Sequence, residues 1–433
     1  MELPQTGRPL VSRRAVVPWL VLLATLPLGL WSYYQNDQIG LFTWQPGERM
    51  GLNYRTFQYA AERARDGAEF YDVAPPGTRD WAIYLYPPGT VPSFYPFTLV
   101  EWTTGYAILT GLSVLAAAGA TWAVVQYVES LGPDLGWVDI ALIFIIFLLS
   151  KHAYGTIYFG NINIILAFAV AVGLWALQRD RQPLSGASFA LAALYKLFPA
   201  LIGLWLLHRR QWRAAGAALT TGLGGLLLGV VLYGTDTTWY YFTEVVSQRA
   251  ETDLFVGGYP VDGTFYVTIQ QPVSHLVAAV WPGAPYSAIL GVSAVIYGGT
   301  LAYFYWNLNT ELDRQMALFA TFVVIVSFTP SLQWYLVLLY PSLIAVLYLW
   351  TEGLARIPFV LGGILMSVTA DTETAVDYLE SLPDPLYDPG YFFLGHGVIP
   401  LYGLLLMLAA CAWHKRRRES TGWAGSRLDC RGR

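Results

Sequence analysis

The side chain best suited to electrostatic chemistry is Lys196, which stands inside a long apolar run. A lysine in hydrocarbon costs about 2.5–3.5 kcal/mol on insertion scales, so a residue of this kind usually has a functional role. Pro199 follows shortly after it and removes a backbone donor, which ends or kinks a helix. A compact cation beside such a break would suit a phosphate group. The alternative is that Lys196 only reaches toward the outer headgroups of a membrane.

Two amides, Asn161 and Asn163, stand at the start of another apolar run. Polar groups on the first turn of a membrane helix are costly unless they are paired. One interpretation is that they cap the helix, since asparagine is a favoured N-cap residue. The other is that one of them points into an outward-facing cavity and binds a polar ligand.

Two further segments place polar or aromatic groups between apolar runs. Tyr86 precedes Pro87 and Pro88, which fix an extended exit from a loop. Gln333 lies in a short turn after Pro330, where its amide could hydrogen-bond a sugar. The aromatic residues that follow Gln333 are equally typical of an interfacial belt.

The stretch 51–64 has the spacing of an amphipathic helix. Its apolar face includes Tyr54 and Phe57, and its polar face includes Gln58 and Glu62. We expect this helix to lie along a membrane interface. A plain surface helix with solvated charges is the alternative.

These segments must be positioned by a scaffold that lies in a membrane. Of 433 residues, 55% are hydrophobic and 12% are charged, and the charged fraction is about half that of a soluble domain. A water-soluble fold cannot hide so many apolar runs of the length that spans hydrocarbon. We therefore expect an all-α polytopic membrane protein with about ten transmembrane helices. The apolar runs lie at 15–34, 97–128, 137–151, 156–177, 184–207, 212–233, 287–306, 315–329, 332–350, 357–370 and 394–413.

Basic residues set the predicted orientation. They gather at the N-terminus, at 178–181, at 208–213 and at 414–418, and the positive-inside rule places all four segments in the cytoplasm. Both ends of the run 184–207 then lie on the cytoplasmic side, which a single crossing of the membrane would not allow. We interpret this run as a re-entrant helical hairpin, because irregular backbone at membrane depth survives only where it lines a cavity. Lys196 would lie near the outer end of that hairpin.

The expected organisation is one membrane domain between two cytoplasmic tails. The tails are 1–14 and the basic segment 414–433, and the membrane domain is 15–413. Three large polar loops then lie outside the cell membrane, at 35–96, 234–286 and 371–393. Because such loops commonly carry function, we expect the active face to be extracytoplasmic.

Several classes of site have no signature in the sequence. A Walker loop, an HExxH motif and a chain of intramembrane carboxylates are missing, which weakens the case for an ATPase, a zinc protease or a proton-driven carrier. Cys411 and Cys430 are too few for a disulfide framework or a metal cluster. We expect no bound metal, no tightly bound cofactor and no nucleic-acid partner.

The order of these parts resembles glycosyltransferase family 87, membrane mannosyltransferases of the GT-C type that use a polyprenyl-phosphate sugar. The resemblance covers roughly residues 15–350. It is carried, in chain order, by the N-terminal helix, the stretch from Asn53 to Asp72, Tyr86-Pro87-Pro88, Gly160-Asn161-Ile162-Asn163, Leu184-Ser185-Gly186 running into Lys196-Leu197-Phe198-Pro199, the stretch from Arg209 to Arg213, and Pro330-Ser331.

The resemblance implies a membrane enzyme that moves a sugar, expected to be mannose, from a polyprenyl-phosphate donor to a hydroxyl of a glycolipid or glycan acceptor, with inversion. In such an enzyme Lys196 would stabilise the departing phosphate. A loop carboxylate would take the proton of the acceptor hydroxyl, which is worth about 10²–10⁴-fold. The expected donor-binding residues are Lys196, Tyr86, Asn161, Asn163 and Gln333.

The sequence departs from the family pattern at two places. The aspartate usual at the start of the loop helix corresponds to Asn53, and an amide cannot act as a general base. The histidine common after the Pro-Ser turn is also missing. Either a nearby carboxylate (Glu48, Asp37 or Glu62) has taken over, or the residue correspondence is shifted, or the chain has lost transferase activity.

Two rival functions stay open. One is a flippase or carrier for a lipid-linked sugar, which a broken membrane helix would also suit. The polar loops gathered on one face speak against it, because alternating access needs gates on both faces. The other is an inactive family member that acts as a binding subunit, which Asn53 favours.

Overall fold

The computed structural model describes residues 8–37, 50–196, 198–247, 253–259, 266–368, 379–380 and 383–429. Helices dominate it, as the sequence predicts, and the two strands have two residues each. The first half contains α1 (Val16–Ala24), α2 (Leu26–Asp37), α3 (Leu52–Arg65), the 3-10 helix η1 (Pro88–Leu99), α4 (Trp102–Ser130), α5 (Trp137–Leu149), α6 (Lys151–Tyr158), α7 (Asn163–Gln178), α8 (Gln182–Tyr195), η2 (Phe198–Leu201), α9 (Ile202–His208) and α10 (Trp212–Tyr240). The second half contains the π-helical turn η3 (Tyr241–Val245), η4 (Asp253–Phe255), β1 (Tyr266–Val267), α12 (Gln270–Val280), α13 (Tyr286–Tyr305), α14 (Glu311–Ser327), β2 (Ser331–Leu332), η6 (Gln333–Leu339), α15 (Tyr340–Leu349), α16 (Arg356–Ser367), α18 (Asp384–His396) and α19 (Ile399–Asp429).

Fewer than ten of the described helices are long and apolar enough to cross a membrane. Three pass this test: Trp102–Ser130, Trp212–Val245 and Tyr286–Tyr305. The number rises to five if two bent pairs each count as one span, namely Trp137–Leu149 with Lys151–Tyr158 and Pro385–His396 with Ile399–Arg418. Shorter apolar helices occupy other predicted runs, at Val16–Trp31, Asn163–Gln178, Gln333–Leu349 and Arg356–Ser367.

A break in the backbone at the end of the predicted run 137–151 bends the helix that follows it. The α5–α6 pair bends by 45° at Ser150, where ψ is 157° and the hydroxyl accepts the N–H of Ala153 at 3.2 Å to start α6. Gly29 of α2 fits against this bend, since a Cβ there would lie 1.9 Å from the carbonyl oxygen of Leu149. The break is thus capped by the Ser150 hydroxyl and covered by α2.

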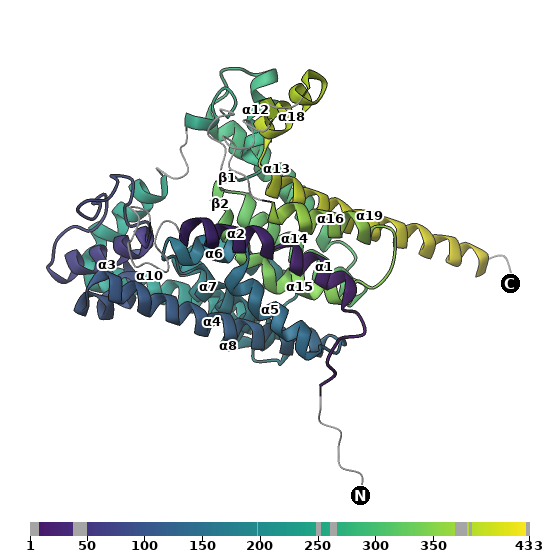
Figure 1. Ribbon diagram of the computed structural model, residues 1–433, viewed down its shortest axis with the longest axis horizontal. Coiled ribbons are helices and arrows are strands. Elements are labelled where there is room, and N and C mark those ends of the chain that lie inside the picture. The colour runs from purple at the N-terminus through teal and green to yellow at the C-terminus, as the bar shows by residue number, and fades with distance from the viewer. Residues whose placement is uncertain are drawn as a thin grey trace, which may run out of the picture.

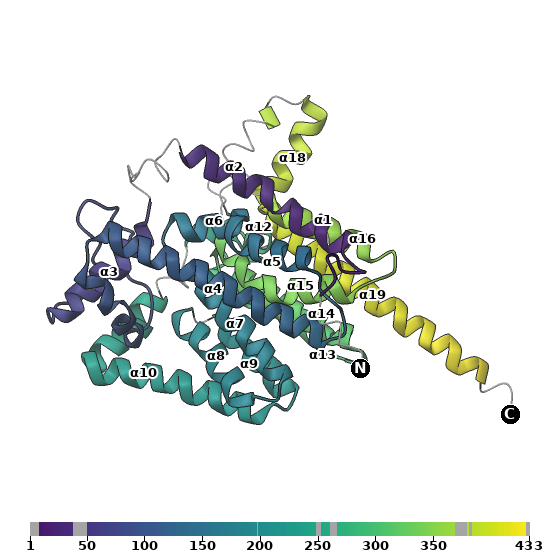
Figure 2. The same cartoon turned by 60° about the horizontal axis from the view of Figure 1, so that its bottom comes forward.

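Two groups of helices meet at η6. In the first group α4, α7, α8 and α10 pack side by side in that order (Figure 2). In the second group α13, α14, α15, α16 and α19 pack together, and α19 extends beyond the rest of the molecule (Figure 1). The segment η6 contacts α7 of the first group and α14 and α15 of the second. It therefore lies at the seam between them.

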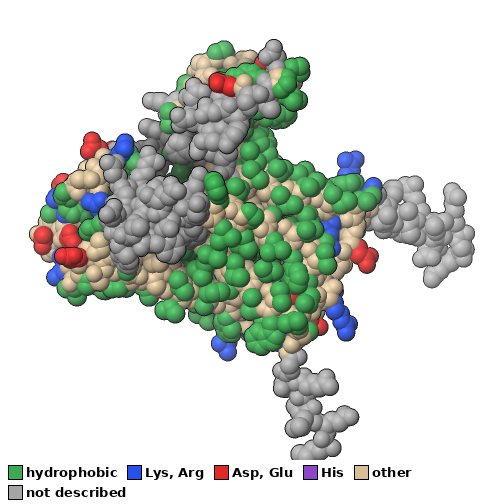
Figure 3. Space-filling view, in the orientation of Figure 1, with side chains coloured by type: hydrophobic (Ala, Val, Ile, Leu, Met, Phe, Trp, Pro, Cys, Tyr) green, Lys and Arg blue, Asp and Glu red, His purple; other side chains and the backbone are tan. Residues whose placement is uncertain are grey.

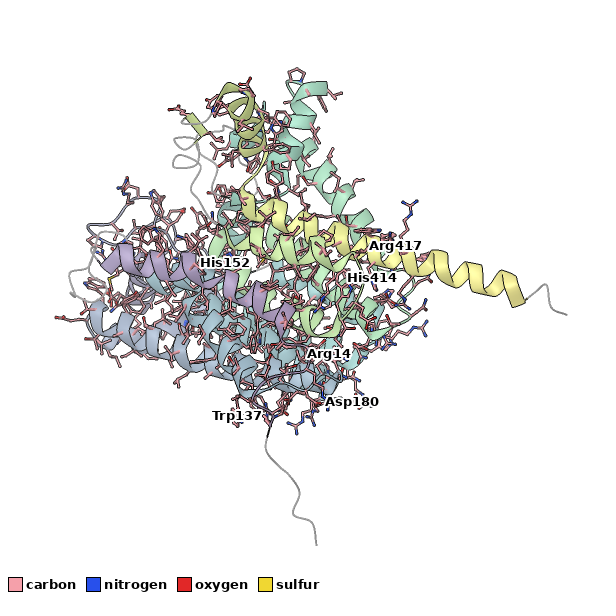
Figure 4. The ribbon with its side chains drawn as sticks, turned by 45° about the vertical axis from the view of Figure 1, so that its right-hand side comes forward. Arg14, Trp137, His152, Asp180, His414 and Arg417 are labelled. Carbon is pink, nitrogen blue, oxygen red and sulfur yellow. The ribbon has the colours of Figure 1, made fainter. Side chains whose placement is uncertain are left out.

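Charged side chains lie toward the two ends of the molecule, and hydrophobic side chains cover the middle of the face shown in Figure 3. Arg14, Asp180 and Arg417 lie toward the same end (Figure 4). The N-terminal segment is joined there to α4 through Arg8 and Glu129, 3.2 Å apart. The predicted cytoplasmic segments are thus gathered at one end. Which side of a membrane that end faces stays a prediction.

The apolar run 184–207 is broken where the proline predicts. Helix α8 ends at Tyr195 and α9 begins at Ile202. The two arms pack mainly on other helices, α8 on α7 and α10, and α9 on α10 and α14. Helix α8 has 14 residues, so it rises about 21 Å and is too short to span a bilayer. This geometry is what a re-entrant segment requires, and its depth in a membrane stays a prediction.

A buried carboxylate ties the N-terminal segment to the helices. Asp139 is fully buried at the start of α5. Its Oδ2 accepts the N–H groups of Ser12 and Gly136, both at 2.9 Å. Its Oδ1 accepts Trp19 Nε1 at 2.9 Å and the hydroxyl of Tyr348 at 2.6 Å. Four donors from four segments therefore depend on one acidic side chain.

We expect Asp139→Asn to destabilise the protein strongly. Whichever way the amide is turned, its NH₂ group faces two of the four donors, and each buried donor left unpaired costs about 1–3 kcal/mol. The free energy of unfolding should therefore fall by about 2–6 kcal/mol, seen as a lower midpoint of thermal unfolding in detergent. Asp134→Asn, at an exposed position of the preceding loop, is the control. A midpoint for Asp139→Asn equal to that of the control would contradict the role given to the carboxylate.

The backbone of the loop exit at Gly89 packs directly against the backbone of α10. A Cβ at Gly89 would lie 1.9 Å from the carbonyl oxygen of Gly225, and a Cβ at Gly229 would lie 2.8 Å from the backbone nitrogen of Gly89. Small residues permit such close approach in membrane helices. The joint fixes η1, and with it the outer loop, to the middle of α10.

Candidate active site

The first turn of α3 is docked on the turn between α6 and α7. The backbone N–H of Asn53 donates to the carbonyl of Phe159 at 2.8 Å. Gly160 permits this approach, because its φ is +65° and a Cβ there would lie 2.6 Å from the Cβ of Tyr54. Asn53 is half-buried. It is therefore fixed next to the start of α7, beside the predicted amide pair.

The prediction that Tyr54 and Phe57 lie on the buried face of α3 is confirmed. The prediction that Gln58 lies on the outward polar face is wrong. Gln58 is buried as well, and its Nε2 donates to the carbonyls of Phe97 at 3.0 Å and Val100 at 2.9 Å. An amide can be buried when its donors are satisfied in this way. Helix α3 is thus clamped onto the end of η1 instead of lying free with its polar face outward.

The structure separates the two amides at the start of α7. Asn161 is buried, and its Oδ1 accepts the N–H of Ile162 at 2.8 Å. The N-cap residue of α7 is Ile162, which has no side-chain capping hydrogen bond, so neither asparagine caps the helix. Asn163 is fully buried, and its Nδ2 donates to the carbonyl of Trp334 at 3.4 Å. The Oδ1 of Asn163 has no hydrogen-bond partner within the described ranges. Asn163, and not Asn161, keeps an acceptor available.

Lys196 is buried at the end of α8, with 4% of its surface exposed. Its Nζ lies 3.3 Å from the centroid of the Tyr335 ring. The negative face of an aromatic ring attracts a cation, with a strength of about 2 kcal/mol or more where both are desolvated. The ring therefore helps to keep a charged ammonium at this depth. From the sequence, Tyr335 is predicted only to belong to an aromatic belt, because no local sequence pattern links Tyr335 to Lys196.

Tyr86 packs against the end of α8 next to Lys196. Its ring lies edge-on to that of Tyr195, with centroids 5.9 Å apart. Its carbonyl accepts the hydroxyl of Tyr71 at 2.8 Å. Tyr195 in turn donates its hydroxyl to Ser93 at 2.7 Å. Buried Tyr86 thus fixes the residue directly before Lys196, which fits positioning better than direct contact with a ligand.

The segment from Gln333 to Tyr335 brings the predicted residues together. Gln333 is half-buried at the start of η6. Trp334 stacks on Phe159, with ring centroids 4.7 Å apart, and its carbonyl binds Asn163. Tyr335 reaches Lys196. One turn of η6 therefore joins the start of α7, the end of α8 and the docking point of α3.

The carboxylates proposed as replacements for Asn53 do not join this cluster within the described ranges. Glu62 is nine residues further along α3, which places it about 14 Å away and on the opposite face of the helix. Burial raises the pKa of Glu62, and the charge of Asp66 raises it further. The side chain of Asp37 and all of Glu48 lie outside the described residues.

Another outer-loop carboxylate, Asp72, is held in place by α10. It has a φ of +54°, and the hydroxyl of Tyr240 donates to its Oδ2. The preceding residue, Tyr71, is the one bound to the carbonyl of Tyr86. Asp72 is exposed. It is the carboxylate that the described loop connects most directly to the cluster.

In the part of the chain that the structure describes, no three side chains of His, Cys, Asp or Glu come together as metal ligands do. The cluster instead offers the cation of Lys196, the amide of Asn163 and the aromatic faces of Trp334 and Tyr335. Such a set suits an anion with a polar group attached.

A family model described as glycosyltransferase family 87 matches residues 84–332. This range covers more than half of the chain and includes Tyr86, both amides and Lys196. Asn53 precedes it, and Gln333 directly follows it.

The chain also has a distant similarity to two solved structures. The crystal structure of ArnT from Cupriavidus metallidurans bound to undecaprenyl phosphate is 14% identical, with a TM-score of 0.34, and the match covers 92% of this chain and 76% of that one. The same protein in the apo state is 15% identical, with a TM-score of 0.31, over 83% of this chain and 71% of that one. No curated protein matches the sequence.

Proposed function

Because the chain belongs to glycosyltransferase family 87, we propose that it is a membrane enzyme that transfers a sugar from a polyprenyl-phosphate donor to a hydroxyl of a lipid or glycan acceptor. Mannose is the proposed sugar, on the resemblance to mannosyltransferases. The proposed fold is of the GT-C type, with both termini in the cytoplasm and the active face outside the cell membrane. The observation that carries the proposal is the convergence of Lys196, Asn163 and the start of η6 on one another.

In the proposed reaction the acceptor oxygen attacks the anomeric carbon from the face opposite the phosphate. The bond between that carbon and the phosphate oxygen breaks, and the polyprenyl phosphate leaves with its electron pair. The acceptor proton passes to a carboxylate. The reaction therefore inverts the anomeric centre.

Lys196 is the proposed partner of the phosphate. A fixed cation in a water-excluded site stabilises negative charge more strongly than it would in water. The buried position of Lys196 against Tyr335 supports this role, because the charge is already placed and needs no reorganisation. Tyr86 and Tyr195 would hold the end of α8 in register.

The direct test is an assay for a new product. Purified protein is incubated with radiolabelled polyprenyl-phosphate mannose and crude membrane lipids, and the lipids are separated. A labelled glycolipid that appears with the protein and not with a heat-inactivated sample supports transfer. Movement of the intact labelled donor across a liposome membrane, with no product, would support the rival carrier instead.

A second prediction concerns the cation–π contact between Tyr335 and Lys196. Tyr335→Leu should lower transfer about 30-fold, since a desolvated cation–π contact is worth about 2 kcal/mol. Tyr335→Phe keeps the ring face and should stay close to the wild type. The measurement is kcat/KM for the donor. Equal losses for the two variants would assign Tyr335 a role through its hydroxyl or through packing.

A further inference from the structure

Three buried polar atoms around the start of η6 have no hydrogen-bond partner among the described residues. They are Asn163 Oδ1, Ser331 Oγ and Trp334 Nε1. Asn163 is 0% exposed and Ser331 is 1% exposed. Buried polar atoms are nearly always bonded, and an unpaired one is unfavourable. A group of three in one short region therefore needs an explanation.

Poor packing of polar groups in general does not explain them. Neighbouring buried hydroxyls are satisfied: Ser342 donates to the carbonyl of Leu339 at 3.0 Å, and Ser327 donates to that of Val323 at 2.6 Å. Other buried atoms without a hydrogen-bond partner, such as Ser185 Oγ and Arg314 Nε, occur singly elsewhere in the described residues, whereas these three belong to one short region.

The three side chains are also held so that they do not bond to one another. Asn163 is fixed through its Nδ2 to the carbonyl of Trp334. The Trp334 ring is stacked on Phe159 and lies against Gly155, where a Cβ would be 3.0 Å from the ring. Ser331 is held in β2, which pairs with β1. The three side chains therefore cannot easily turn to form hydrogen bonds with one another.

The unpaired atoms border the residue that reaches the cation. Trp334 directly precedes Tyr335, whose ring covers the Lys196 ammonium. Their chemistry is mixed: the asparagine oxygen accepts, the indole N–H donates, and the serine hydroxyl does both. Sugar hydroxyls also donate and accept, so such a set fits neighbouring hydroxyls of a pyranose.

We propose that Asn163, Ser331 and Trp334 form a subsite that binds the hydroxyl groups of the donor's sugar, next to the phosphate at Lys196. The inference rests on the proposed function and assigns phosphate recognition and sugar recognition to different residues. Lys196 and Tyr335 recognise the phosphate, which every polyprenyl-phosphate sugar shares. The three unpaired atoms recognise the sugar.

Two ligands separate these roles: polyprenyl-phosphate mannose and the sugar-free polyprenyl phosphate. Ser331→Ala should weaken binding of the first about threefold to tenfold, which is the effect of one neutral hydrogen bond, and change binding of the second less than about twofold. Trp334→Phe should act in the same direction. Lys196→Met should weaken both. The measurement is the dissociation constant for each ligand in detergent.

Thermal stability of the ligand-free protein gives a second test, because the substitution that weakens sugar binding should not weaken the fold. Ser331→Ala removes an unpaired buried hydroxyl, so the unfolding midpoint should stay equal or rise. Ser342→Ala is the matched control, because its hydroxyl is bonded. The control should lower the midpoint and leave the ratio of the two dissociation constants unchanged.

The outcomes distinguish this inference from the proposed function. If the wild type binds polyprenyl phosphate and its mannosyl form equally well, the subsite is wrong and phosphate recognition stands. If Ser331→Ala lowers the midpoint and leaves both affinities unchanged, the atoms hold an internal water and the inference is also wrong. If the wild type binds neither ligand, the proposed function itself fails.

Discussion

Replacing Lys196 with methionine should remove most sugar transfer while leaving the protein folded. Methionine keeps the length of the side chain and deletes its charge, so the phosphate would leave without its proposed counterion. Losing a fixed electrostatic stabiliser of this kind costs about 10²–10³-fold in kcat. Because an ammonium in an apolar run opposes burial, its removal should not destabilise the fold. The measurement is single-turnover transfer from radiolabelled donor, normalised to folded protein.

Lys415 supplies a matched control, because it is as deeply buried as Lys196, with 4% of its surface exposed. Its Nζ donates to the carbonyls of Tyr303 and Phe304, both at 3.0 Å, and to that of Trp306, at the end of α13. Lys415→Met should therefore lower stability and retain transfer per folded molecule. Transfer by Lys196→Met at the level of this control would remove Lys196 from the donor site.

The general base should be a carboxylate other than Glu62. We expect either Glu48→Gln or Asp37→Asn to lower transfer about 10²–10⁴-fold, the usual contribution of general-base catalysis. Glu62→Gln should stay close to the wild type, because Glu62 lies about 14 Å from Asn53 and on the opposite face of α3. The pH dependence of kcat should lose its acidic limb in the variant that lacks the base.

Two further variants complete this experiment. Asp72→Asn tests the loop carboxylate that Tyr240 holds. Asn53→Asp places a carboxylate at the docked start of α3 and should increase transfer strongly if the chain has lost its base. If none of these changes alters transfer, replacement of the usual aspartate by another carboxylate is wrong.

Local patterns predicted the elements that depend on nearby residues. Helix α3 follows from its apolar spacing, and the end of α8 follows from Pro199, because both effects act within one or two turns of backbone. The predicted number of crossings exceeds the three to five described spans that are long and apolar enough, for a similar reason. Hydropathy averages over a run and does not register a change of backbone within it, such as the change from the 3-10 helix η6 to α15 inside the run 332–350.

The contacts that build the candidate site could not be predicted in this way. Asn163 meets the carbonyl of Trp334 across 171 positions of sequence, and Lys196 meets Tyr335 across a similar separation. The burial of Gln58 depends on carbonyls 39 and 42 residues away. Each pairing is decided by tertiary packing, which leaves no mark in the spacing of either partner.

The contact between Gly89 and the Gly225–Gly229 stretch of α10 limits how the protein can move. Sliding α10 along η1 by a single residue would bring leucine side chains, at 226 to 228, into a space already filled by backbone and the Pro88 ring. Close-packed interfaces switch between discrete arrangements and do not deform gradually. The described part of the outer loop and α10 should therefore move together as one rigid unit.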